Sequence, residues 1–139
     1  MGATHCNEEQ KMSEYGHMKA FDKMTKEFMG YVGGAGFEYA ALVDSPNAKL
    51  KFENRDGSRA LAKETSPSDR WLGEDYQQYA DWGLGNNYIW IVLEEDQTIS
   101  MKDDRTRKLY WYQKNGTKWL CWTKSGDNNN QAILTFQME

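Results

Sequence analysis

The feature that most constrains this chain is an Asn-Gly dipeptide between two runs of aromatic and aliphatic residues. Asn115-Gly116 favours a two-residue type I′ turn, because both central positions of that turn need a positive φ. Such a turn fixes the register of its strands, so we expect a hairpin built from residues 108–114 and 118–124. The predicted cross-strand pairs are Lys114 with Thr117, Gln113 with Lys118, Tyr112 with Trp119, Trp111 with Leu120, Tyr110 with Cys121 and Leu109 with Trp122.

Both faces of this predicted hairpin are apolar, which is unusual for an antiparallel sheet with one solvated face. Side chains alternate along a strand, so each face collects four of them. One face carries Tyr110, Tyr112, Trp119 and Cys121, and the other carries Leu109, Trp111, Leu120 and Trp122. Three covers for the second face stay open: a helix, a sheet that curls towards a barrel, or a partner molecule.

Two segments show the apolar spacing of amphipathic helices. Residues 13–32 repeat apolar side chains every three or four positions between charged ones, and Gly30, Gly33, Gly34 and Gly36 predict that this helix ends by about Val32. A shorter second helix is predicted after residues 66–69. Its apolar side would hold Trp71, Leu72, Tyr76, Tyr79 and Ala80.

The remaining segments read as strands. Residues 37–43 and 49–53 predict one hairpin, residues 59–63 a further strand, and residues 88–94, 98–102, 108–114, 118–124 and 131–138 an antiparallel meander. The predicted fold is α+β, with the N-terminal amphipathic helix and the short second helix packed on an antiparallel sheet of about seven or eight strands. The C-terminal half of the chain is the β-meander.

We expect one domain over residues 1–139. It would comprise the N-terminal helix with its Gly-rich turn (1–36), a hairpin plus the short helix (37–86) and the meander (87–139). No internal repeat can be aligned along the sequence. No apolar run is long enough for a transmembrane helix and no secretory signal is visible, so we expect no membrane partner and a cytoplasmic location.

Charge and motif content exclude several function classes. The net charge is −4 and no cluster of five or more Lys or Arg residues occurs, so we do not expect a nucleic acid as the partner. His5, Cys6 and His17 match no common zinc spacing, and Cys121 lies among rings, where a thiol usually behaves as a small buried hydrophobe. We therefore predict no metal, no cofactor and no catalytic site, with Cys6 and Cys121 as free thiols.

The surplus of ring surface in the hairpin is the candidate binding feature. Exposed Tyr and Trp provide rigid contact area and are enriched at interfaces. The predicted binding residues are Tyr110, Tyr112, Gln113, Lys118 and Trp119. We expect a non-catalytic protein of the inhibitor, immunity or assembly-subunit kind that binds another protein, with homo-oligomers allowed. The alternative is a carbohydrate- or small-ligand-binding module that uses the same rings.

Overall fold

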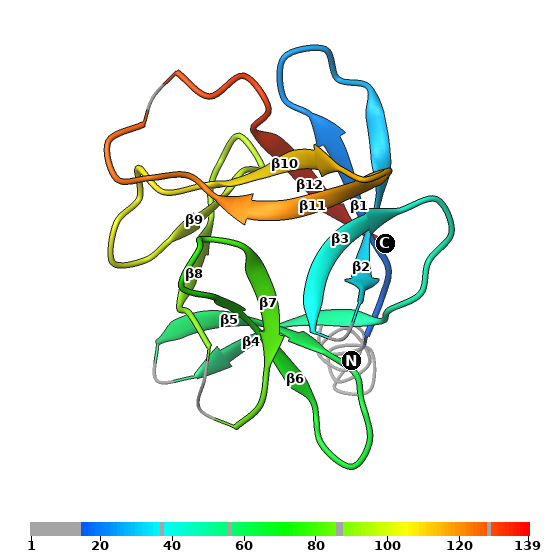
Figure 1. The fold of residues 1–139 in the computed structure, drawn as a ribbon. Helices are drawn as coiled ribbons and strands as arrows, with labels where there is room; N and C mark the ends of the chain where they lie inside the picture. The colour runs from blue at the N-terminus through cyan, green and yellow to red at the C-terminus, as the bar shows by residue number, and fades with distance from the viewer. Residues whose placement is uncertain (1–14, 37, 56, 86–87, 128) are drawn as a thin grey trace, which may run out of the picture.

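The computed structural model describes residues 15–139 apart from residues 37, 56, 86–87 and 128 (Figure 1). Over these residues the chain is all β, with twelve strands, antiparallel pairing throughout and no helix. The strands are β1 (Met18–Asp22), β2 (Phe28–Ala35), β3 (Tyr39–Val43), β4 (Leu50–Arg55), β5 (Ser58–Lys63), β6 (Arg70–Glu74), β7 (Ala80–Gly83), β8 (Ile91–Leu93), β9 (Ile99–Met101), β10 (Leu109–Lys114), β11 (Thr117–Trp122) and β12 (Leu134–Met138). The predicted α+β class is therefore wrong.

Six strands, β1, β4, β5, β8, β9 and β12, form a nearly closed, barrel-like sheet. β12 pairs with β1, β4 with β5, β5 with β8 and β8 with β9. A bridge between Gly16 and Leu50 joins the segment before β1 to β4. The Phe136 amide donates to the Gln97 carbonyl at 2.9 Å, which brings β12 against the segment that enters β9. This closure leaves little of the barrel edge unpaired, which limits edge-to-edge association.

The other six strands form three hairpins, β2–β3, β6–β7 and β10–β11, which converge at one end of the barrel. Tyr39 pairs with Asp81, Tyr79 with Cys121, and Trp119 with Ala41, so each hairpin contacts the other two. Strands β3, β7 and β11 lie around the middle of Figure 1, towards the viewer. A six-stranded barrel closed by three such hairpins is the β-trefoil arrangement. We call the hairpin end the cap.

The fold contains three structural repeats of four strands, and equivalent positions recur every 40 residues. Leu42, Trp82 and Trp122 are one such set, and all three are buried. The Trp82 indole donates to the Gly33 carbonyl at 3.1 Å, and the Trp122 indole donates to the Gly73 carbonyl at 3.0 Å. Each indole thus ties one hairpin to the hairpin before it. No repeat can be aligned from residue identities, because the three structural repeats share the positions of their buried residues and few of the residues themselves.

The hairpin predicted around Asn115-Gly116 is confirmed with its register. The ladder runs from Leu109 opposite Trp122 to Lys114 opposite Thr117, as the turn required. Asn115 has a φ of 53° and Gly116 a φ of 79°, the two positive values that a type I′ turn needs. Leu109, Leu120 and Trp122 point into the core. Of the three covers considered, the curled sheet is the one that the protein uses for this face.

The N-terminal helix is replaced by β1, a turn and β2. Inward and outward side chains alternate along β1, which is the period of a strand. Asp22 ends this strand, and its Oδ1 accepts hydrogen bonds from the amides of Met24 and Thr25, both at 2.9 Å. Lys26 then takes a φ of 68° and the chain reverses. The helical spacing was misleading because it combined apolar residues from two strands across an Asx turn.

The second predicted helix is the hairpin β6–β7, and its turn uses the same device. Asp75 Oδ1 accepts hydrogen bonds from the amides of Gln77 and Tyr79, at 2.8 and 2.9 Å, and Gln78 takes a φ of 73°. The carboxylate satisfies backbone donors that a helix would otherwise have paired internally. The apolar residues assigned to one helix face therefore divide between two strands.

Strand pairing also differs from the sequence-based expectation. The strands predicted over residues 37–43 and 49–53 exist as β3 and β4, but β3 pairs with β2, β7 and β11, and β4 pairs with β5. The strand predicted over residues 59–63 is β5. The five C-terminal strands are present as β8 to β12, but β12 pairs with β1 rather than extending a meander. The sheet has 12 strands, more than expected.

Candidate functional site

Three aromatic rings meet at the centre of the cap. Tyr39 begins β3, Tyr79 directly precedes β7, and Trp119 lies in β11, so the three occupy equivalent positions 40 residues apart. The Tyr39 ring is 5.9 Å from each of the other two ring centroids and nearly perpendicular to both. Tyr79 and Trp119 are nearly parallel, with centroids 6.3 Å apart. These are favourable aromatic geometries, so the rings hold one another in place.

The rings enclose a small hollow that we call the cap pocket. It measures about 240 Å³ and is lined by Tyr39, Tyr79, Lys114, Asn115 and Trp119. The Trp119 indole donates to the Lys114 carbonyl at 3.3 Å, which fixes the ring against the Asn115-Gly116 turn. Tyr112 stacks on Tyr79 at 6.5 Å and adds a fourth, outer ring. The pocket therefore combines flat aromatic walls with two exposed polar residues, Lys114 and Asn115.

The structure separates the five predicted binding residues into three groups. Trp119 lines the cap pocket, and Tyr112 lies beside it with 45% of its surface exposed. Gln113 is exposed on the same hairpin, and Lys118 is half-buried opposite Leu42. Tyr110 is half-buried beside Cys121, where burial raises the pKa of its hydroxyl. Tyr110 is not among the residues that line the cap pocket.

Sequence reasoning missed Tyr39 and Tyr79. The sequence pattern places Tyr79 in a helix and Tyr39 in a hairpin with the wrong partner strand. The signal that could have found them is the spacing of 40 residues between Tyr39, Tyr79 and Trp119, which matches the spacing of Leu42, Trp82 and Trp122 three positions later. Two aromatic or aliphatic positions repeating with one period indicate a repeat architecture even where identities differ.

Several carboxylates lie around the cap rings, and their negative charges raise one another's pKa. Burial raises the pKa of Asp81, and the negative charges of Asp75 and Glu38 raise it further. Asp81 Oδ1 is buried and accepts no hydrogen bond from the described residues. Burial, followed by the Asp75 charge, also raises the pKa of the Tyr39 hydroxyl. The cap is therefore acidic next to its aromatic centre.

Replacing Asp81 with asparagine is expected to change the pH dependence of stability. The raised pKa means that the Asp81 carboxyl group binds its proton more tightly in the folded protein than in the unfolded chain. The stabilisation is complete below the ordinary Asp pKa of 3.8 and is lost as the pH rises through the raised value. Asp81→Asn should therefore raise the free energy of unfolding at pH 7 more than at pH 4, measured by urea denaturation. Asp44→Asn, at an exposed site, is the control; equal effects of the two variants at both pH values would contradict the assignment.

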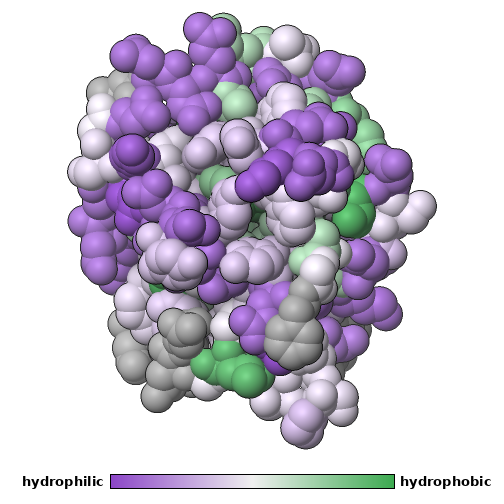
Figure 2. Space-filling view, viewed as in Figure 1, coloured by the Kyte–Doolittle hydropathy of each residue, from purple (hydrophilic) through white to green (hydrophobic). Residues whose placement is uncertain are grey.

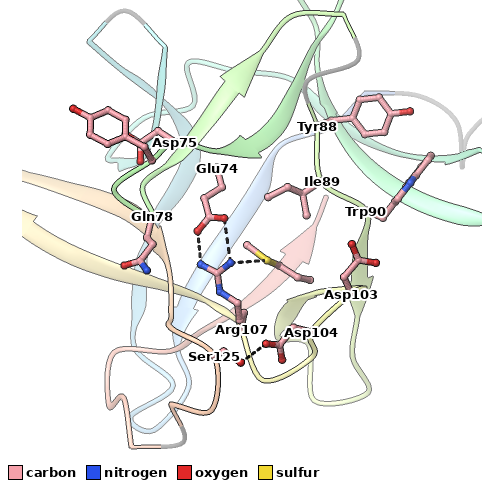
Figure 3. Close-up of a pocket in the computed structure, with 12 residues that line it drawn as sticks. Glu74, Asp75, Gln78, Tyr88, Ile89, Trp90, Asp103, Asp104, Arg107 and Ser125 are labelled. Atoms are coloured by element: carbon pink, nitrogen blue, oxygen red, sulfur yellow. Dashed lines mark hydrogen bonds and ion pairs between the residues drawn. The ribbon is translucent and has the colours of Figure 1, made fainter.

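A second, larger hollow lies beside the cap, and we call it the side cleft (Figure 3). It measures about 810 Å³ and is formed by the β6–β7 turn, the segment before β8 and the β9–β10 loop. Glu74 and Arg107 face each other in it as an ion pair with two hydrogen bonds. It shares no lining residue with the cap pocket.

The face that carries the cap shows little continuous apolar surface. Figure 2 shows mainly hydrophilic and intermediate residues there, with small and separate hydrophobic areas. Among the described residues, the large hydrophobic side chains that are exposed are Met24, Phe28, Tyr76, Leu84 and Tyr112. Only Tyr112 among these belongs to the cap rings. The aromatic rings that the hairpin was expected to expose, Tyr112 and Trp119, are thus partly covered by Tyr39 and Tyr79.

Of the residues considered for metal binding and catalysis, the structure describes His17 and Cys121, and these two have different neighbours. His5 and Cys6 lie outside the described residues, and His17 places its ring against Tyr31. Cys121 is a free thiol with 2% exposure, and burial raises its pKa to about 12, so the nucleophilic thiolate is disfavoured at neutral pH. Within the described part of the chain, no three His, Cys, Asp or Glu side chains are grouped as a metal site. The same residues include no helix that could cross a membrane.

Comparisons with known proteins add a likeness of fold. No family model matches the chain, and no curated protein matches it. Among solved structures, the chain is similar to one described as the crystal structure of lysenin pore, with a TM-score of 0.56 and 12% sequence identity. The match covers 92% of this chain and 49% of that one, so this chain spans about half of its length. At this identity the likeness concerns the fold alone.

Proposed function

We propose that this protein is a non-catalytic binding module whose cap pocket holds a small, ring-shaped polar ligand, for which a sugar is the best chemical fit. The observation that carries the proposal is the convergence of Tyr39, Tyr79 and Trp119 on one hollow. Aromatic faces pack against the C–H faces of a sugar ring, while amide and ammonium groups bind its hydroxyls. Asn115 and Lys114, which line the pocket, supply those groups.

The size of the pocket supports a small ligand over a drug-sized one. Its volume of about 240 Å³ is smaller than the roughly 300–1,000 Å³ of sites for drug-sized molecules. A hexose has about twelve heavy atoms, and at about −0.3 kcal/mol per atom it would bind with a Kd of about 2 mM. Longer oligosaccharides that reach Tyr112 would bind more tightly.

The test is calorimetric titration of the full chain with a panel of neutral mono- and oligosaccharides. We expect at least one of them to bind, and Trp119→Leu to abolish the binding because leucine keeps apolar volume but offers no flat face. Phe28→Leu is the matched control, since it removes a ring that is 45% exposed and does not line the cap pocket. Thermal melts of both variants confirm that they are folded.

Two results would count against the proposal: no sugar of the panel binds at millimolar concentration, or Trp119→Leu and Phe28→Leu bind equally well. Docking of a protein partner is the second candidate, favoured by the 45% exposure of Tyr112 beside Gln113. A stable protein interface buries about 800 Å² per partner. Protein docking would replace sugar binding if a purified partner lost affinity for Tyr112→Ala while sugars left the calorimetric signal unchanged.

A further inference from the structure

The side cleft has the dimensions of a ligand site and lies between the second and third repeats. Its volume of about 810 Å³ is within the range of small-molecule sites. Figure 3 shows Ile89 and the Glu74–Arg107 pair near its middle, Gln78 on one side, and Trp90 and Asp103 on the other. The floor is thus partly apolar and the walls are polar or aromatic.

The one guanidinium in this cleft is already used by the protein. Arg107 binds both oxygens of Glu74, and its Nε donates to the Thr123 carbonyl at 2.8 Å. Its Nη1 also approaches the Met101 sulfur at 3.4 Å. Because these contacts engage Nε, Nη1 and Nη2, Arg107 is poorly placed to receive an anionic ligand.

The cleft carries an excess of negative charge. Its lining has four carboxylates, Glu74, Asp75, Asp103 and Asp104, and one guanidinium, so its formal charge is −3. Asp104 is engaged by Thr106 and Ser125. Asp103 is exposed, and within the described part of the chain no hydrogen bond or ion pair involves it. A concave site of one charge sign attracts ligands of the opposite sign and repels anions.

The Trp90 ring lies next to this carboxylate (Figure 3). Trp90 is half-buried, and the Tyr88 ring meets it edge to face with centroids 5.0 Å apart. Tyr76 at the rim is 92% exposed. The face of a Trp ring is the best aromatic partner for a cation, and the attraction grows when the cation is partly desolvated.

We propose that the side cleft binds an organic cation that donates hydrogen bonds, namely an alkylammonium or guanidinium group. Trp90 would contact the alkyl stem and the charge, and Asp103 would accept hydrogen bonds from the charged nitrogen. Carboxylate acceptors favour a primary ammonium over a quaternary one, which has no N–H to donate. The group could belong to a free polyamine or to a lysine side chain of a peptide. This inference does not depend on the cap pocket.

The experiment titrates the full chain with spermidine, with trilysine amide and with tetramethylammonium at low ionic strength, followed by calorimetry. We expect spermidine or trilysine to bind, tetramethylammonium to bind more weakly, and added salt to reduce affinity because the attraction is screened. Binding of spermidine alone would identify a free amine as the source of the group, and binding of trilysine alone would identify a peptide.

The decisive variant is Asp103→Asn, which removes one charge from an exposed side chain without a structural partner. We expect it to weaken binding roughly fivefold, as for one partly screened charge contact. Asp44→Asn, an exposed carboxylate outside the cleft, should leave affinity unchanged. The proposal is overturned if neither cation binds, if both variants bind equally, if neutral sugars occupy the cleft instead, or if Trp119→Leu abolishes the cation binding.

Discussion

Trp122→Ala is expected to lower the free energy of unfolding by about 3–5 kcal/mol, the usual cost of truncating a fully buried aromatic side chain. Trp122 is 1% exposed, and its indole donates to the Gly73 carbonyl. The variant therefore leaves a cavity and also leaves a buried carbonyl without its partner. A domain of this size is stable by about 5–15 kcal/mol, so the loss is a large part of the total.

The measurement is equilibrium unfolding in urea, followed by tryptophan fluorescence and by far-UV circular dichroism. Trp122→Phe separates the two contributions, because phenylalanine fills most of the space but cannot donate the hydrogen bond, and it should cost about 1–2 kcal/mol. Trp82→Ala should match Trp122→Ala, since the two side chains have equivalent roles in successive repeats. Tyr76→Ala, at a side chain that is 92% exposed, should change stability by less than about 0.5 kcal/mol. A loss below about 1 kcal/mol for Trp122→Ala would contradict the repeat-to-repeat role of the indoles.

Glu74→Gln is expected to lower the free energy of unfolding by about 2–3 kcal/mol, because Arg107 would keep its charge in a partly buried place without a carboxylate. The side chains of Glu74 and Arg107 are 19% and 18% exposed, and the pair joins β6 to the β9–β10 loop. Removing both charges in Glu74→Gln/Arg107→Met should restore part of the loss. A double-mutant cycle should therefore give a coupling of about 1–3 kcal/mol.

The Arg105–Glu94 pair is the matched control for this cycle. Arg105 also binds its carboxylate partner through two nitrogens, but its side chain is 61% exposed. Arg105→Met should cost less than about 1 kcal/mol, because solvent screens the exposed guanidinium and Lys108 remains 3.8 Å from the Glu94 carboxylate, whose side chain is 14% exposed. Equal losses for Arg105→Met and Glu74→Gln would show that burial does not set the strength of the Glu74–Arg107 contact.

The part of the fold that the sequence predicts well is the part that depends on the residues of a single turn. Asn115-Gly116 determines both the turn type and the pairing of β10 with β11, since neighbouring residues decide both. Asp22 and Asp75 carry comparable information, because each caps a turn with its side chain. Their signal was obscured by apolar residues that fall at helical spacing across the turn. The two predicted helices failed for that reason.

Long-range pairing could not be read from the hairpins alone. β12 pairs with β1 across almost the whole chain, and β3 meets β7 and β11 only because the three repeats are arranged about a common centre. The candidate site shows the same limit. Trp119 was identified from its own hairpin, whereas Tyr39 and Tyr79 belong to the pocket through the repeat of 40 residues. The spacing of 40 residues, once recognised, would have predicted both a fold of repeats and the three aromatic rings of the cap pocket.

Sugar binding in the cap pocket can be tested by an NMR titration that follows the tryptophan indole N–H signals while a binding sugar is added. Trp119 lines the cap pocket, whereas Trp82 and Trp122 are enclosed in the core at 1% exposure. We expect the Trp119 signal to shift with ligand concentration and the signals of Trp82 and Trp122 to stay in place. A sugar that binds without moving the Trp119 signal would contradict the assignment of the cap pocket as the binding site.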